Sequence, residues 1–394
     1  MANISDYLDW RGDLSFSADP FQEVDSLILS EAVYTDLGGI VPGPGTGESI
    51  GLAKACHAFF SKHTEEEILA QVSSTKMAPF LLQKMACSKR FSKVRMTGYV
   101  NCVEEEAQTQ FAVVTFLLPD DTVYVAFRGT DNTIIGWKED FNMSFLSHTK
   151  GQTMAADYLS QNFAGEKRPI RVGGHSKGGN FAVYASAFCQ KGVQKKIIGI
   201  YSNDGPGFQQ SVLKTDEYQR ILPKVTSIVP EQSIVSLLFE NHLRPKVVRS
   251  VNNGASQHDA MSWQVIGNQF VEAEGLSEKS LLFDQAFHTW LDNLDKKTRK
   301  VFSDAVFELL ASDGASTLDD LKNSGASWEH AIKSMRNLDP EKQEIVYEVL
   351  RKLAVTSVDT LRQNLKQKPK PKPFEGLHRL LFRETPALSA PTIA

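Results

Sequence analysis

The hydrophobic pattern changes character twice along the chain. Between residues 96 and 251, short runs of β-branched and aromatic residues alternate with helical patterns at 151–163 and 180–191. The runs predict strands at 99–103, 111–118, 123–127, 170–172, 197–201, 225–229 and 247–251, with a Pro119-Asp120-Asp121 turn between the second and third. Strands that alternate with helices predict βαβ units and a mostly parallel sheet covered on both faces.

The N-terminal stretch has a helical pattern with one interruption. Asp19-Pro20 suits the start of a helix, and the apolar residues behind it fall on one face: Phe21, Val24, Leu27 and Ile28. Residues 41–51 are too rich in Gly and Pro to be regular. They predict a surface loop rather than a phosphate-binding loop, because Glu48-Ser49 stands where such a loop needs lysine and Ser or Thr.

Beyond residue 276 the pattern is helical only. Three apolar faces recur, around Trp290, Val306 and Val349. We therefore expect a sheet domain at 1–275 and an α-helical appendage at 276–366, packed on the sheet or standing as its own bundle. Residues 367–394 form a tail that opens with a Pro/Lys-rich linker, KQKPKPK.

Composition excludes several classes of protein. The chain has 43 Lys and Arg against 47 Asp and Glu, so no overall field favours nucleic acid. Its four cysteines lack metal-ligand spacing and are expected to be reduced core residues, so neither a metal nor a cofactor is predicted. The N-terminus carries no signal-peptide pattern and no apolar run reaches membrane-spanning length, so we expect a cytoplasmic protein without a transmembrane segment.

One stretch carries the clearest chemical signal. Gly174-His175-Ser176-Lys177-Gly178 fits G-x-S-x-G, follows the apolar run Ile170-Arg171-Val172 and precedes a helix of small residues. In this motif a serine occupies a strained turn between strand and helix, with its hydroxyl exposed above the sheet. A catalytic serine needs a base, an acid that orients the base, and amide donors for the oxyanion.

Candidates for these roles follow other predicted strands. His258 lies in a polar loop after the last strand and is the preferred base over His242. Asp204, directly after the strand at 197–201, is the preferred acid; Glu231, after the next strand, is the alternative, and Asp259 ranks low because it adjoins His258. Because ligands of parallel sheets bind at the carboxyl ends of strands, these side chains could converge.

The oxyanion donors should come from two places. One is the amide of the residue after the nucleophile, Lys177, and the other lies in a loop after an earlier strand. Phe127-Arg128-Gly129-Thr130 is that loop, and Thr130 could offer both its N–H and its hydroxyl. Arg128 is expected to form a buried ion pair or a backbone tether, with Asp140 as a conceivable partner.

Three ordered motifs together resemble a known family. A strand ending Phe127-Arg128-Gly129-Thr130, then Trp137-Lys138-Glu139-Asp140, then the Ser176 motif is similar to the class 3 (fungal-type) lipases of the α/β-hydrolase superfamily. The wider chain looks like a bacterial branch of that superfamily. The resemblance covers about residues 96–262 and implies an α/β-hydrolase fold with Ser176 as nucleophile, His258 as base, and Thr130 and Lys177 as oxyanion donors.

The acid departs from the class 3 pattern. Those lipases carry it in a segment after the later strand, where this chain has Ser233-Ile234-Val235-Ser236. Asp204 instead resembles the position that lipases of pancreatic type use, after the preceding strand.

The sequence and this resemblance therefore predict a serine hydrolase that cleaves small-molecule or lipid-like carboxylic esters through a Ser-His-acid triad and an acyl-enzyme. Two alternatives stay open: an inactive binding module on the same fold, suggested by the serine in place of the usual acid, and an acyltransferase with the same nucleophile.

Overall fold

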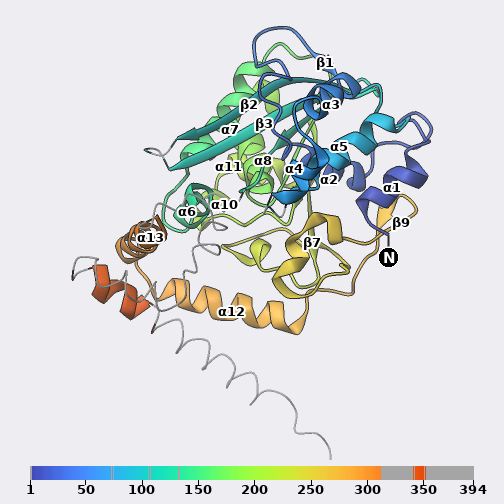
Figure 1. The fold of residues 1–394 in the computed structure, drawn as a ribbon. Helices are drawn as coiled ribbons and strands as arrows, with labels where there is room; N and C mark the ends of the chain where they lie inside the picture. The colour runs from blue at the N-terminus through green and yellow to red at the C-terminus, as the bar shows by residue number, and fades with distance from the viewer. Residues whose placement is uncertain are drawn as a thin grey trace, which may run out of the picture.

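The computed structural model describes residues 2–311, except for 72, 74, 105, 107, 132 and 133, together with 340, 342–349 and 351. The predicted tail at 367–394 lies outside the described residues. An eight-stranded sheet forms the centre of the described part (Figure 1). Its strands are β1 (Ile50–Gly51), β2 (Arg95–Glu104), β3 (Thr109–Leu117), β4 (Val123–Phe127), β5 (Ile170–His175), β6 (Ile197–Asn203), β7 (Val225–Pro230) and β8 (Lys246–Val248).

The strands lie side by side in the order in which they occur in the chain. Pairings from β1 to β4 are antiparallel and those from β4 to β8 are parallel. Parallel connections are almost always right-handed, so a strand order that never reverses puts the crossover helices on one face. The opposite face must then be covered by another part of the chain.

Two sets of helices cover the two faces. One set follows β4 and shares a core with Val113, Val125 and Phe127 of the sheet. It comprises α6 (Ile134–Asn142), α7 (Lys150–Asn162), α8 (Lys177–Phe188), α9 (Lys191–Gln194), α10 (Gln210–Leu213) and α11 (Asp216–Ile221). The N-terminal set comprises α1 (Ile4–Arg11), α2 (Glu23–Ala32), α3 (Leu52–Phe60), α4 (Glu65–Ala70) and α5 (Ala78–Cys87). Its core contains Val114 and Ala126, the alternate residues of the same strands.

Helices beyond residue 276 pack onto the first of these cores. They are α12 (Glu278–Asp292), which runs along one edge of the molecule in Figure 1, and α13 (Lys296–Ala311). Trp290 and Leu291 of α12, Phe302 of α13, and Val346 and Val349 from a further helical stretch belong to the same hydrophobic cluster as the sheet. The division of the chain at 276 stays a prediction, but the described helices beyond it share the sheet's core.

Several predicted boundaries differ from the structure, and three of the differences have a clear structural setting. The helix expected at Asp19-Pro20 begins only at Glu23. The Arg90 guanidinium donates hydrogen bonds to the main-chain carbonyls of Asp19 and Pro20, so these carbonyls do not start the helix. The Asp25 carboxylate accepts from the Gln22 amide and caps the helix there. The helix expected at 180 begins at Lys177. The strand expected to reach 251 ends at Val248, because Arg249 turns to pair with Val271 instead.

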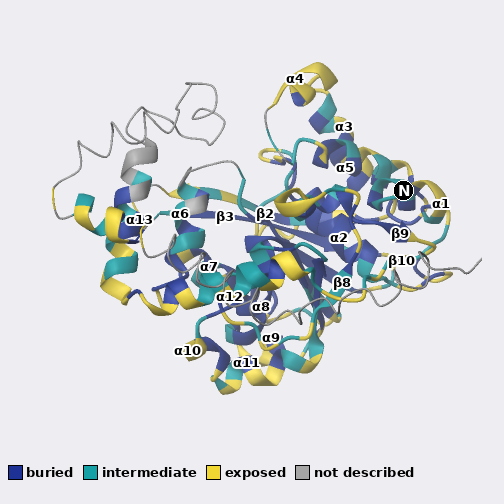
Figure 2. Ribbon diagram, turned by 90° about the horizontal axis from the view of Figure 1, so that it is seen from below, coloured by how far each residue is buried: buried dark blue, intermediate teal, exposed yellow. Residues whose placement is uncertain are grey.

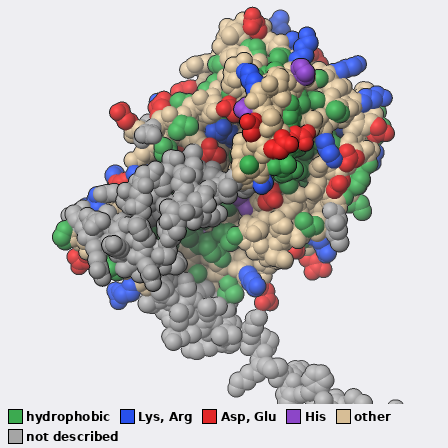
Figure 3. All heavy atoms as spheres, viewed as in Figure 1, with side chains coloured by type: hydrophobic (Ala, Val, Ile, Leu, Met, Phe, Trp, Pro, Cys, Tyr) green, Lys and Arg blue, Asp and Glu red, His purple; other side chains and the backbone are tan. Residues whose placement is uncertain are grey.

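The four cysteines are free, but only two of them belong to the core. Cys56 and Cys189 are buried, whereas Cys87 is exposed and Cys102 is half-buried. The expectation that all four are core residues was therefore wrong for this pair. None of the described helices combines the length and the apolar character that a membrane span requires. Acidic and basic side chains are interspersed over the face seen in Figure 3, in keeping with the near balance of charge.

Helix α2 is buried around almost its whole circumference, as the dark ribbon in Figure 2 shows. Its polar residues therefore need partners inside the protein. Asp25 receives two hydrogen bonds from the Arg90 guanidinium, at 2.7 and 2.5 Å, and both side chains are completely buried. The Ser26 and Ser30 hydroxyls lie 2.9 Å from that of Tyr124 on β4.

The Asp25–Arg90 pair predicts a large effect of truncation on stability. Arg90→Ala leaves a buried carboxylate without its cation, which typically costs about 3–5 kcal/mol of unfolding free energy. The matched control is Lys84→Ala, because Lys84 and Asp9 form an exposed pair, for which about 0–1 kcal/mol is expected. Urea denaturation of both variants measures the difference. Equal losses would contradict the role given to the buried pair.

Candidate active site

Ser176 lies in a turn with an unfavourable backbone conformation, which only close packing around it can maintain. Its φ of 58° and ψ of −134° are rare for a residue with a side chain. The Ser176 amide donates to the carbonyl of Asn203, at 2.9 Å. A Cβ on Gly174 would lie 2.3 Å from the Gly178 carbonyl carbon, and one on Gly178 would lie 2.1 Å from the Phe127 oxygen. Glycine at both positions therefore lets β4, β5 and α8 meet at this turn.

His258 and Asp204 are joined directly. The Nδ1 atom of His258, the last residue of a short 3₁₀ helix (Gly254–His258), lies 2.6 Å from Oδ2 of Asp204. Asp204 directly follows β6 and is completely buried, whereas the His258 side chain is 30% exposed. Because Nδ1–H donates to the carboxylate, Nε2 of His258 carries a free lone pair and can accept a proton.

Further contacts hold the Asp204 carboxylate. The Ser233 hydroxyl donates to its Oδ1 at 2.5 Å and lies 2.7 Å from the Ser236 hydroxyl. The Asp204 amide donates to the Ile228 carbonyl of β7 at 2.8 Å, and its own φ is 48°. Ser233 thus hydrogen-bonds the carboxylate beside His258. The sequence signalled position 233 only as a departure.

The other candidates for base and acid have different surroundings or partners. His242 is exposed. The Glu231 amide donates to the Val248 carbonyl of β8, and the Glu231 carbonyl accepts from the amide of Ser277, the residue before α12. The Asp259 carboxylate caps the next turn by accepting from the Met261 amide at 3.0 Å.

The two predicted oxyanion donors flank Ser176. Lys177 is the first residue of α8, where main-chain N–H groups have no partner within the helix and point outward at its positive end. Its side chain is buried and binds Glu139 at 3.0 Å, so only the amide is available to a substrate. The Thr130 hydroxyl donates to Asp140 at 2.6 Å. Burial raises the pKa of Asp140 to about 6, against the opposing effects of Lys177 and Thr130.

Arg128 does not pair with Asp140. Its guanidinium donates to the Asn101 side chain at 3.1 Å and lies 3.7 Å from Asp131. Asp140 instead accepts from Thr130, which is two residues along the same loop. The suggested Arg128–Asp140 pair was therefore wrong.

A second histidine, His175, packs against His258. The His175 ring stacks on His258 with centroids 4.6 Å apart, and its Nε2 lies 2.9 Å from the His258 carbonyl oxygen. Its Nδ1 lies 3.0 Å from Glu31 of α2, and both side chains are buried. Burial disfavours the charged ring, but the Glu31 carboxylate, with a smaller contribution from Asp204, outweighs it and raises the pKa of His175. Nothing in the sequence pattern singled out Glu31.

Two pockets reach the candidate residues. A pocket of about 250 Å³ is lined by Thr130, Ser176, Lys177 and His258 together with apolar side chains. Another, of about 300 Å³, is also lined by Thr130, Ser176 and His258, and most of its other lining residues are of polar type. The structure thus brings Ser176, His258 and Thr130 to common cavities, with Asp204 behind His258. Among the described residues, no cluster of His, Cys, Asp or Glu could hold a metal ion.

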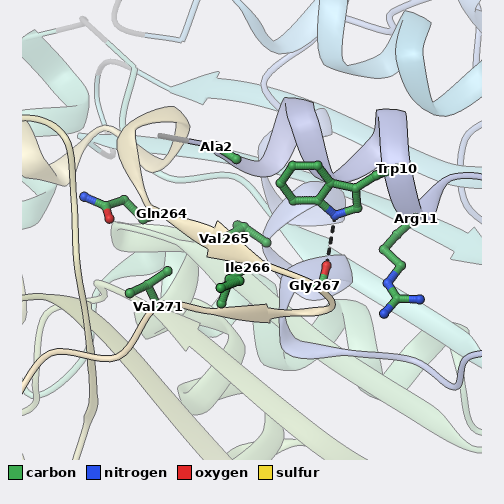
Figure 4. Close-up of a pocket in the computed structure, with 8 residues that line it drawn as sticks. All are labelled: Ala2, Trp10, Arg11, Gln264, Val265, Ile266, Gly267 and Val271. Atoms are coloured by element: carbon green, nitrogen blue, oxygen red, sulfur yellow. Dashed lines mark hydrogen bonds between the residues drawn. The ribbon is translucent and has the colours of Figure 1, made fainter.

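A larger pocket, of about 620 Å³, lies apart from these residues (Figure 4). It is formed by α1 and the hairpin of β9 (Val265–Ile266) and β10 (Gln269–Phe270), where the Trp10 indole donates to the Gly267 carbonyl at 2.9 Å. Its lining includes Arg11 but no Ser, Cys, His, Asp or Glu. It therefore lacks the groups that hydrolytic chemistry needs.

This chain is similar to a protein family and, at low identity, to solved structures. The model of the family described as Mbeg1-like matches residues 85–308. Among solved structures, a protein described as M37 lipase is 15% identical, with 56% of this chain and 70% of that chain covered, at a TM-score of 0.36. Two lipase–propeptide complexes from Rhizomucor miehei, one native and one a deletion mutant, are 13% and 12% identical, at TM-scores of 0.31 and 0.30. They cover 43% and 46% of this chain and 65% of theirs. None of the curated proteins matches the sequence.

The Glu31–His175 pair predicts a pH-dependent part of the stability. The pKa of His175 is raised on folding, so its contribution is complete below its unfolded pKa of about 6.5 and disappears as the pH rises through the folded pKa. Glu31→Gln removes the main cause of this shift. We expect the loss of unfolding free energy in Glu31→Gln to be larger at about pH 5.5 than at about pH 9, measured by urea denaturation. A loss that is the same at both pH values would exclude this linkage.

Proposed function

The chain belongs to the Mbeg1-like family, and we propose that it is a serine hydrolase of the α/β-hydrolase fold that cleaves carboxylic esters. In this proposal Ser176 is the nucleophile, His258 the base and Asp204 the acid. The observation that carries it is the 2.6 Å bond from His258 to the buried Asp204 carboxylate, beside a serine in a strained turn that lines the same pocket. Backbone strain of this kind clusters at active sites, and a serine nucleophile requires a general base such as histidine.

The reaction begins when Ser176 Oγ attacks the ester carbonyl while its proton passes to Nε2 of His258. The Asp204 carboxylate stabilises the resulting imidazolium through Nδ1. His258 then gives the proton to the leaving alkoxide, and the C–O bond breaks to leave an acyl-enzyme and an alcohol. Water repeats these steps in the second half: His258 takes its proton, the hydroxide attacks the acyl carbon, and the proton returns to Ser176.

The negative charge that develops on the carbonyl oxygen needs donors already in place. We assign this role to the amides of Lys177 and Thr130, because the Lys177 side chain binds Glu139 and the Thr130 hydroxyl donates to Asp140. The position of Lys177 at the start of α8 adds the positive end of the helix dipole. The loss of one such donor typically lowers the rate about 10²- to 10³-fold.

The alternative of an inactive binding module rested on the serine at position 233. In the structure Ser233 donates to Asp204, so a carboxylate still supports His258. This contact favours catalysis over binding alone. Transfer of the acyl group to another acceptor would use the same residues, and no contact in the site favours it over hydrolysis.

Ser176→Ala tests the nucleophile. We expect kcat/KM for short p-nitrophenyl esters to fall about 10⁴-fold or more, because the attacking oxygen is removed. Unchanged circular dichroism and urea midpoint show that the variant is folded. Undiminished turnover in the folded variant would exclude the proposed reaction at Ser176.

A second pair of variants separates the two candidate acids. Asp204→Asn keeps the size of the side chain but removes the charge that orients and stabilises His258, and kcat should fall by about 10⁴-fold. Glu231→Gln is the matched control, with turnover expected within twofold of the wild type. The reverse order of effects would assign the acid to Glu231.

A further inference from the structure

The pocket of about 250 Å³ at Ser176 has two kinds of wall. At one end lie the polar groups already assigned to catalysis. Asp131, Asp140, Ser144 and Pro206 also line it, and the apolar wall is formed by Phe141, Val235, Leu238, Phe239, Phe287 and Phe307. A cavity that joins reactive groups to an apolar chamber suits a ligand that is polar at one end and hydrocarbon at the other.

The C-terminal helices build one side of this chamber. Phe287 comes from α12 and Phe307 from α13, and the Phe287 ring meets that of Phe239 with centroids 6.5 Å apart. Two hydrogen bonds join α13 to the segment that follows β4. Arg299 donates to the Ser144 carbonyl at 2.8 Å, and Ser303 donates to the side chain of Asn142 at 3.2 Å. The helices beyond residue 276 are thus part of the pocket.

The loop that carries His258 indicates which part of an ester enters this chamber. The leaving alkoxide must lie near His258, which protonates it. His258 lines both pockets, but the rest of its loop, including Asn252, Ser256 and Asp259, lines only the other pocket, of about 300 Å³, whose lining residues are mainly polar. A leaving group in that polar pocket puts the acyl chain in the apolar one.

Size limits the acyl chain. An apolar cavity of about 150 Å³ holds a benzene molecule of six carbons. By this measure, 250 Å³ has room for about ten carbons. We propose that the apolar pocket between Ser176 and helices α12 and α13 binds an unbranched acyl chain of up to about ten carbons, so that medium-chain esters are the substrate class. This inference rests on the proposed function of Ser176.

The acyl-chain length dependence of kcat/KM tests the pocket. With p-nitrophenyl esters from acetate to palmitate, each added methylene should raise kcat/KM about three- to fourfold until the pocket is filled near ten carbons, with no further gain beyond. Val235→Phe narrows the chamber and should lower the ratio of kcat/KM for octanoate to that for acetate about tenfold. Because it is a ratio, this readout does not depend on how much of the variant is active.

Val103→Phe is the matched control, since Val103 is exposed on β2, away from the pocket, and its ratio should equal that of the wild type. Calorimetric binding of decanoate to Ser176→Ala gives a readout without turnover, and Val235→Phe should weaken this binding about tenfold. Turnover that depends on Ser176 but not on chain length would overturn the pocket assignment alone. Decanoate binding without any turnover would instead overturn the proposed reaction and keep the pocket.

Discussion

The left-handed backbone of Ser176 is the constraint on which the rest of the candidate site depends. Such a conformation is unfavourable for a residue with a Cβ and persists only where its surroundings enforce it. The surroundings here are β4, β5 and the first turn of α8, which approach so closely that Gly174 and Gly178 have no room for a side chain. Gly129 is equally confined, since a Cβ there would lie 2.5 Å from the His175 carbonyl oxygen. The close packing at these three glycines therefore fixes both Ser176 and the loop that carries Thr130.

The N-terminal helix α2 extends this support to the other side of the sheet. Its buried polar residues each have a partner, Asp25 with Arg90, Ser26 with Tyr124, and Glu31 with His175. The last pair lies directly beneath His258, because His175 stacks on that ring and bonds its carbonyl oxygen. The strand order leaves this face without crossover helices, so the segment that covers it also stabilises the site.

Much of the fold and of the candidate site followed from local patterns. Alternation of short apolar runs with helical segments is a property of neighbouring residues, and it placed Thr130, Ser176, Asp204 and the His258 loop each after a strand. Because a sheet aligns its carboxyl ends, their convergence could be expected. The choice between Asp204 and Glu231 could not be made in this way, since both follow strands. It is the contact with His258 that distinguishes them.

What the sequence missed depends on partners far away along the chain. The Ser233 hydroxyl supports Asp204 only because β6 and β7 are adjacent and end at the same edge. Glu31 and Asp25 could not be recognised as buried, because their partners His175 and Arg90 belong to β5 and to the segment before β2. The apolar faces of α12 and α13 predict that these helices are buried, but the sequence does not show which surface they cover. Only the packing in the structure places Phe287 and Phe307 at the pocket.

Covalent labelling with a fluorophosphonate tests the central claim most directly, because this probe reacts with serines that a neighbouring base activates. Intact-protein mass spectrometry and peptide mapping of the native chain should show one adduct, on Ser176, and no adduct after the chain has been unfolded in urea. Native protein that stays unlabelled, or is labelled at another serine while a control hydrolase reacts, would contradict the account.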